Sequence, residues 1–288
     1  MKVSVIITTK NEQEHIENCL KSIKSQSFNQ NEIELIVVDN NSADKTKEIA
    51  SKYTDKVYAF GPERSAQRNF GIRKAMGQYV LYLDADMILS KDVIKECIQK
   101  IETENCIALY IPERIVGEVS ADLSALPRQS YWILVRDFER SFYSGTVIDA
   151  VRFVRKDKIL EINGFDESFF TAEDWDLDRR IKEAGKVGII KSHLYHNESN
   201  FKLIGYIKKK SYYSKNLNHY IAKWGKNDEI LKKQLGFGYR YFGVYVEQGK
   251  WIKLLIHPFL AAGMYFLKFA LGLIFLFSSS KNSSNNKR

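Results

Sequence analysis

The feature that most constrains the fold is an alternation, over the first half of the chain, between short apolar runs and longer stretches of helical periodicity. The apolar runs, rich in Val, Ile and Leu, are residues 3–7, 33–38, 57–60, 79–83 and 107–111. The helical stretches between them are residues 12–25, 43–53, 65–75 and 91–101. Strands that alternate with helices pair in parallel, and strands this apolar are covered on both faces. We therefore predict an α/β fold, a mostly parallel sheet with helices on both faces.

Polar residues follow three of these predicted strands at the points where the strands end. The chain reads TTKNE at residues 8–12, DNNS at residues 39–42 and DAD at residues 84–86. The carboxyl ends of parallel strands meet at one edge of a sheet, which is where open α/β sheets bind their ligands. We therefore expect these three polar clusters to lie together.

Asp84 and Asp86 end the strand in YVLYLDADMIL with two carboxylates two residues apart. Both can reach one divalent cation, and hard oxygen ligands suit Mg²⁺ or Mn²⁺, which bind substrate phosphates as well. The alternative is a solvated turn with two acidic residues, because a DxD pattern alone is short and common. The position at the end of a central strand favours the metal site.

The composition limits the partners and the compartment. The 288 residues carry a formal net charge of +9, which favours a polyanionic partner: nucleic acid, an anionic membrane surface or a phosphate-bearing substrate. The three cysteines form no CxxC pair, so neither a disulfide framework nor a zinc site is expected and a reducing compartment fits best. The apolar run at residues 3–7 is too short for a signal-peptide core and is interpreted as a strand of a cytosolic domain.

The second half of the chain is less regular. A strand is predicted at residues 151–154, a helix at residues 171–185 with Thr171 as its N-cap, and a short strand at residues 187–190. Beyond residue 200 lysines interleave with tyrosines and tryptophan. The composition therefore changes near residue 200, where we place a boundary.

Five blocks of the sequence stand out, and in order they are VSVIITTKNEQEHIENCLKSI, IELIVVDNNSADKT, ERSAQRNFGIRKAMGQYVLYLDADM, INGFDES and AEDWDLDRRIKEAG. In order and spacing these blocks resemble the family 2 glycosyltransferases of the GT-A fold. Five ordered blocks are far more specific than any one motif. The resemblance covers about residues 1–200. It implies the GT-A fold and a glycosyltransferase, in the first instance a hexosyltransferase, that uses a UDP- or GDP-sugar with Mn²⁺ or Mg²⁺.

The resemblance also implies which residues hold the metal. In the family the DxD motif clamps the diphosphate of the donor through a divalent cation, which stabilises the charge that develops as the sugar leaves. Asp86 would be a direct ligand, and Asp84 would bind the ribose or reach the metal through water. Some members use a histidine after a later strand as a further ligand, and LYH matches that position, which points to His196. The alternative is a structural histidine, because a lone histidine is more often structural than a metal ligand.

Four further residues match donor-binding positions of the family. Thr9 and Glu12 match the first loop, Asp39 matches the residue that hydrogen-bonds the base, and Arg68 matches a position near the nucleotide where it could pair with phosphate. The alternatives are ordinary, because Thr9 and Asp39 could cap helices and Arg68 could be a surface charge. The aspartate of the ED motif, here Asp174, is the catalytic base of inverting members, although acidic residues are common in any first helical turn.

The C-terminal region resembles the basic, apolar extensions of membrane-associated members. Residues 258–277 hold a single charge, Lys268, and are long enough to span a bilayer, although an in-plane helix or a helix buried against the soluble domain also fits. We therefore predict a catalytic domain at residues 1–200, a basic aromatic-rich helical extension at 201–250, a membrane-associated apolar segment at 251–277 and a disordered tail at 278–288.

The predicted function is a metal-dependent, inverting transfer of a sugar to a lipid or lipid-linked saccharide at the cytoplasmic face of the cell membrane. Acceptor contacts are expected in residues 115–150 and at Arg152 just beyond them. No nucleic-acid motif accompanies the basic segment, so no nucleic-acid partner is expected. Two alternatives stay open, a nucleotidyltransferase of similar layout and a non-catalytic basic scaffold. The first loop lacks the glycines that a nucleotidyltransferase usually shows.

Overall fold

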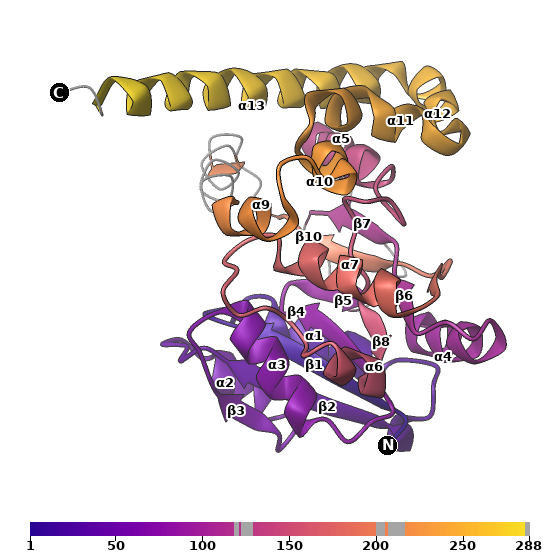
Figure 1. The fold of residues 1–288 in the computed structure, drawn as a ribbon. Coiled ribbons are helices and arrows are strands. Elements are labelled where there is room, and N and C mark those ends of the chain that lie inside the picture. The colour runs from indigo at the N-terminus through magenta and orange to yellow at the C-terminus, as the bar shows by residue number, and fades with distance from the viewer. Residues whose placement is uncertain (118–120, 122–128, 200–204, 207–216, 286–288) are drawn as a thin grey trace.

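The computed structural model describes residues 1–117, 121, 129–199, 205–206 and 217–285, and for residues 273–285 it describes the backbone alone. The main sheet and the helices that cover it form one end of the molecule, and the C-terminal helices lie at the opposite end, with α13 (Pro258–Asn285) crossing that end (Figure 1). The predicted basic extension at residues 201–250 lies partly outside the described residues, including Lys208, Lys209, Lys210 and Lys215.

The main sheet has seven strands in the order β3-β2-β1-β4-β8-β6-β9. These strands are β1 (Val3–Thr9), β2 (Ile33–Asp39), β3 (Val57–Ala59), β4 (Tyr79–Asp84), β6 (Ala108–Tyr110), β8 (Phe153–Arg155) and β9 (Val187–Ile189). Strands β3, β2, β1 and β4 are mutually parallel, as are β6 and β9, whereas β8 runs antiparallel to both of its neighbours. The prediction of a mostly parallel sheet is confirmed, and the reversed β8 is the exception that the apolar pattern does not reveal.

Helices cover both faces of this sheet, as predicted. They are α1 (Ile16–Lys24), α2 (Thr46–Ala50), α3 (Arg64–Lys74), α4 (Val93–Thr103), α6 (Lys156–Glu161) and α7 (Glu173–Ala184), and a single 3-10 turn, η1 (Gln30–Glu32), precedes β2. One buried cluster joins α1 and α4 to one face, and a second joins α3, α6 and α7 to the other. Alternate residues of β1 enter the two clusters, because successive side chains of a strand point to opposite faces.

Two local predictions need correction. The helix expected from residue 12 begins only at Ile16, because the preceding residues form a loop in which the backbone N–H of Glu12 donates to Thr46. Thr171 is not the N-cap of α7. Ala172 occupies that position with a left-handed φ of 63° and no side-chain cap bond, so the chain enters this helix through a backbone turn and not through a capping hydroxyl.

A second, smaller sheet lies beside the ends of the main one and was not predicted. Its strands are β5 (Met87–Leu89), β10 (Leu194–Asn197) and β7 (Glu113–Val116), in the order β5-β10-β7. Strand β10 pairs antiparallel with β5, which directly follows Asp86, and parallel with β7. This small sheet therefore carries His196 to the end of the DAD turn.

The remaining described helices build the C-terminal end of the molecule. They are α5 (Tyr131–Arg140), α9 (Asn218–Trp224), α10 (Glu229–Leu235), η2 (Tyr239–Gly243), α11 (Val244–Val246), η3 (Glu247–Gly249), α12 (Trp251–Ile256) and α13. Figure 1 shows α13 lying across α5, and a buried cluster of α5, α11 and α13 side chains joins them. Helical backbone continues to Asn285, through most of the polar tail that the sequence predicts to be disordered.

Lys268 explains how an apolar helix tolerates a charge in its middle. Its side chain is 7% exposed, and its ammonium lies 3.1 Å from a carboxylate oxygen of Glu139 in α5 and donates to the carbonyl of Arg240. Burial lowers the pKa of Lys268, and Glu139 opposes that shift. The lysine therefore pins α13 to α5. Among the described residues, no helix has the combination of length and hydrophobicity that crossing a bilayer requires.

We expect Glu139→Gln to destabilise the protein by roughly 3 kcal/mol, because the buried ammonium of Lys268 and the guanidinium of Arg136 would both lose this carboxylate. The measurement is the free energy of unfolding in urea, compared with Glu183→Gln on the exposed face of α7. If the two variants unfold with equal free energies, the Glu139–Lys268 pair does not hold α13 in place.

Candidate active site

The ends of β1, β2 and β4 bring three predicted site residues to one edge of the sheet. Thr9 pairs in register with Asp39, and Thr8 pairs with Asp84 and donates a hydrogen bond of 3.2 Å to its carboxylate. Asp39 is fully buried and accepts hydrogen bonds from the backbone N–H and the hydroxyl of Ser42. The polar clusters that follow the strands therefore lie together, as the parallel topology predicts.

Thr9 and Glu12 lie at the same edge. The hydroxyl of Thr9 is buried and has no hydrogen-bond partner among the described residues, which leaves it available to a ligand. Glu12 lies in the loop between β1 and α1, where its backbone N–H is held by Thr46 and its side chain is partly exposed. This loop is thus fixed to the start of α2 beside the strand ends.

Arg68 is the centre of the site. It projects from α3, is fully buried, and donates to Asp84 at 3.0 Å and to Asp174 at 2.6 Å. The guanidinium also lies 5.2 Å and 5.1 Å from the ring centres of Tyr82 and Phe165, which hold its plane. One arginine therefore joins the first aspartate of the DAD turn to the aspartate of the ED motif, 90 residues apart in sequence.

The acidic groups of the site are balanced by two arginines of α3. Burial would raise the pKa of Asp84, but the charges of Arg68 and Arg64 lower it well below its usual value. Glu173, which the sequence did not single out, contacts Arg64 at 3.2 Å, and burial together with the charge of Asp174 raises its pKa. In the sequence, Glu173 stands out only as the first residue of the ED pair. Its contact with Arg64 of α3 could not be predicted, because the two residues lie far apart in the chain.

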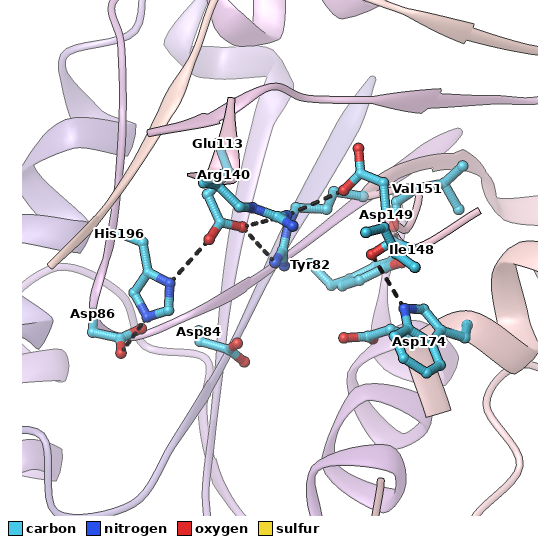
Figure 2. Close-up of polar contacts among 12 residues, drawn as sticks. Tyr82, Asp84, Asp86, Glu113, Arg140, Ile148, Asp149, Val151, Asp174 and His196 are labelled. Carbon is cyan, nitrogen blue, oxygen red and sulfur yellow. Dashed lines mark hydrogen bonds and ion pairs between the residues drawn. The ribbon is translucent and has the colours of Figure 1, made fainter. Parts of the chain in front are cut away.

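Asp86 and His196 form a separate pair beside Asp84. The Nε2 atom of His196 lies 3.1 Å from one carboxylate oxygen of Asp86, while the other oxygen is buried without a hydrogen-bond partner among the described residues. Figure 2 shows His196 between Asp86 and Glu113. Burial would lower the pKa of His196, but Asp86 and Glu113 raise it to about 10. This environment favours a positive charge at the imidazole, which would have to release its Nε2 proton to bind a cation.

These residues fit a divalent cation in part. The described residues contain no group of three or more His, Cys, Asp or Glu side chains arranged to hold a metal ion. The carboxylate of Asp84 accepts hydrogen bonds from Thr8 and Arg68 and forms none with His196, whereas Asp86 contacts His196 directly. The unpartnered oxygen of Asp86 is the observation that suits a cation, and Mg²⁺ or Mn²⁺ takes its remaining ligands from water and phosphate.

The sequence missed the residues that support His196. Glu113, at the start of β7, accepts a hydrogen bond of 3.1 Å from Nδ1 of His196 and is itself bound by Arg140 and Arg152. The pKa of Glu113 is held well below its usual value, since the charges of Arg140, His196 and Arg152 outweigh its burial. The charged residue at the start of a short apolar strand was the signal that could have identified it.

Comparison with known proteins identifies relatives of this chain. The family model of glycosyl transferase family 2 matches residues 4–161, more than half of the chain. The poly(ribitol-phosphate) β-N-acetylglucosaminyltransferase TarS of Staphylococcus aureus is 32% identical over 120 residues, which cover 38% of this chain and 21% of TarS. The GalNAc(5)-diNAcBac-PP-undecaprenol β-1,3-glucosyltransferase of Campylobacter jejuni is 30% identical over 190 residues, which cover 60% of this chain and 57% of that enzyme.

Two solved structures share the fold. The crystal structure of TarS 1–349 has a TM-score of 0.57 at 21% identity and covers 92% of this chain and 79% of its own. The mannosyltransferase PcManGT of Pyrobaculum calidifontis, solved with GDP-Man and Mn²⁺, has a TM-score of 0.57 at 18% identity and covers 97% of this chain and 79% of its own. These similarities confirm the predicted GT-A fold, and the sequence match over residues 4–161 shows that the chain belongs to glycosyl transferase family 2.

Proposed function

We propose that this chain transfers a hexosyl group, with inversion, from a UDP- or GDP-sugar to a lipid or lipid-linked saccharide. The observation that carries the proposal is the link through Arg68, which places Asp84 and Asp174 on either side of one buried guanidinium. Diphosphate release and proton removal from the acceptor would then take place at neighbouring groups. The family match favours this reaction over a nucleotidyltransferase or a non-catalytic scaffold.

The donor would lie along the edge formed by the strand ends. In our proposal Asp39 and the loop of Thr9 and Glu12 hold the nucleoside, and Arg68 pairs with the phosphates. Asp84 binds the ribose or reaches the metal through water. The hydroxyl of Thr9 and the Nε atom of Arg68 support this placement, because both are buried without a hydrogen-bond partner among the described residues and such atoms mark a place prepared for a polar ligand.

The metal would be held by Asp86 and His196. When bound, Mn²⁺ or Mg²⁺ supplies positive charge to the departing diphosphate. Glu113 fixes the imidazole by accepting from Nδ1, which leaves Nε2 directed at Asp86. Support from outside the chain comes from PcManGT, which was solved with Mn²⁺, and from TarS, which was solved with UDP-GlcNAc.

Asp174 would act as the catalytic base. Its carboxylate accepts from Arg68 through one oxygen, and its side chain is 30% exposed, so an acceptor hydroxyl can approach it. A screen of UDP- and GDP-sugars for donor consumption with Mn²⁺ tests the whole proposal, with a polyprenyl-linked saccharide as acceptor. The proposal expects consumption of at least one donor, and loss of that activity in Asp84→Asn. Failure to bind or consume any nucleotide-sugar would overturn it.

We propose that the acceptor is reached at a membrane surface on which α12 and α13 lie in the plane. Of the 17 large hydrophobic side chains exposed in the described structure, ten fall between residues 237 and 269. They include Leu255, Ile256, Phe259 and Phe266, which are 56–82% exposed. Exposed Trp, Phe and Leu beside lysine are typical of helices that lie in a bilayer interface. The Campylobacter relative, whose name specifies an undecaprenol-linked substrate, supports a lipid-borne acceptor.

A cavity beside this face supports contact with charged headgroups. It has a volume of about 600 Å³ and lies between β7, α5 and α12, and its lining includes Arg114, His193, Lys253 and His257. Burial and the charges of Lys250 and Arg114 lower the pKa of Lys253, and Asp137, which also lines the cavity and pairs with Arg114, opposes that shift. In our proposal Lys253 and the two histidines of this lining face an anionic headgroup.

We expect a triple variant to be released from sedimenting membranes. In it glutamine replaces Leu255, Phe259 and Phe266 at the same time. Removal of α13 would be a poorer test, because it would uncover the buried face of α5. The matched control replaces Leu160 and Phe170, which are 44% and 53% exposed on other parts of the molecule. High salt should leave the wild type bound, since it screens the charged contacts and not the apolar ones. A wild-type protein that stays in the supernatant would contradict the membrane proposal.

A further inference from the structure

A buried network of charges extends behind the proposed metal ligands. Glu113 is 7% exposed, and its carboxylate accepts from His196 at 3.1 Å, from Arg140 at 2.9 Å and from Arg152 at 3.3 Å. Arg140 also donates to Asp149 at 3.1 Å, and Figure 2 shows this chain of contacts from Asp86 to Asp149. Opposite charges alternate along the network, so each buried charge has a partner.

Within the described part of the chain, Arg152 has an unpartnered terminal nitrogen, unlike Arg136, and Arg68 lacks a partner only at its Nε atom. Its side chain is 12% exposed, its Nη2 atom is held by Glu113, and its Nη1 atom is buried with no hydrogen-bond partner among the described residues. Arg136 has carboxylate partners on both terminal nitrogens, in Glu139 and Glu198. A buried guanidinium nitrogen without a partner costs free energy unless a ligand or water satisfies it.

The open nitrogen of Arg152 belongs to the side of the sheet that carries the candidate site. The residue lies just before β8, and its backbone carbonyl accepts from the N–H of Tyr82 in β4, two residues before Asp84. The charges of Glu113, Asp84 and Asp174 help to raise the pKa of Arg152 against its burial, and the ion pair of its guanidinium is with Glu113. The guanidinium is therefore near both carboxylates but is tied to neither.

We infer that Arg152 is a phosphate-binding residue of this enzyme and that Glu113 is the positioning residue that holds it. The Nη1 atom would donate to a phosphate oxygen, either of the nucleoside diphosphate or of a phosphate on the acceptor. A fixed guanidinium with a free donor suits phosphate, because the charge is retained at every pH and the donor is already oriented. This inference rests on the proposed function for the presence of a phosphate, and adds a residue that lies outside the five sequence blocks that resemble the family.

The test is the affinity of the full chain for UDP and GDP, measured by calorimetry in EDTA, and for a short-chain prenyl phosphate. We expect Arg152→Gln to weaken binding of one of these phosphates by about 10- to 100-fold, as for loss of one hydrogen bond to a charged group. Binding of uridine, guanosine or the matching prenol should not change. The fold should persist, because Glu113 keeps Arg140 and His196.

The control is Arg155→Gln, which removes the same charge three residues later from a side chain that is 34% exposed and paired with Asp157. Glu113→Gln as a single substitution should weaken phosphate binding several-fold. Added to Arg152→Gln it should have no further effect, as expected when one residue acts through the other. Unchanged affinity for all phosphates in Arg152→Gln, or an equal loss for the nucleosides, would overturn the inference. A wild type that binds neither UDP nor GDP when Mn²⁺ replaces EDTA would instead contradict the proposed function.

Discussion

Asp174→Asn is expected to lower turnover by roughly 10²–10⁴-fold with a hydroxyl acceptor, because asparagine cannot accept the proton that the acceptor must lose. The side-chain oxygen of asparagine can still accept from Arg68, so the guanidinium should stay in place and donor binding should change little. Single-turnover rates and the dissociation constant of the nucleoside diphosphate separate these two effects.

The control for the loss of a negative charge is Asp157→Asn, on an exposed part of α6. A wild-type rate in Asp174→Asn would show that the base lies elsewhere, or that the acceptor arrives already ionised, as a lipid phosphate would. Acceptors with a hydroxyl and with a phosphate, assayed in parallel, distinguish these two explanations.

Asp86→Ala is expected to reduce metal-dependent transfer by about 100-fold or more, since removing a group that stabilises charge on the departing diphosphate costs several kcal/mol. The side chain is 26% exposed at a turn after β4, and His196 would keep Glu113 as a partner, so the fold should survive. The measurement is the rate of transfer as a function of Mn²⁺ concentration, with thermal unfolding as the check on the fold.

Asp55→Ala, at an exposed position between α2 and β3, is the matched control for charge. Near-normal transfer by Asp86→Ala at low Mn²⁺ would exclude Asp86 as a ligand. A loss that excess Mn²⁺ restores would support the assignment, because it would show a weakened metal site and not a damaged protein.

The strand-end residues could be predicted because their positions depend on the local pattern. The apolar runs of β1, β2 and β4 fix where each strand ends, and parallel pairing then sets Thr9, Asp39 and Asp84 at one edge. The roles of Asp86, Asp174 and His196 came from the family resemblance, since a short acidic motif by itself has many explanations. The contact of His196 with Asp86 agrees with that choice of histidine.

The partners of these residues could not be read from the sequence. Arg68 joins Asp84 to Asp174, and Glu113 joins His196 to Arg152, through contacts between elements far apart in the chain. Such contacts depend on how β7 and β10 pair in the second sheet, and these strands of four residues each are too short to leave a clear periodic signal.

The sequence by itself determined the α/β class, the parallel core and the edge at which the polar groups gather, because side-chain periodicity and strand ends are local properties. The tertiary structure alone decided how the charges of the site are paired and which elements pack against the apolar C-terminal segment, namely α5 and α11. An apolar helix has the same sequence pattern in lipid, in the interface or in a core. The pairing of Lys268 with Glu139, 129 residues away in sequence, fixes one face of α13 on α5 and leaves Phe259 and Phe266 outward.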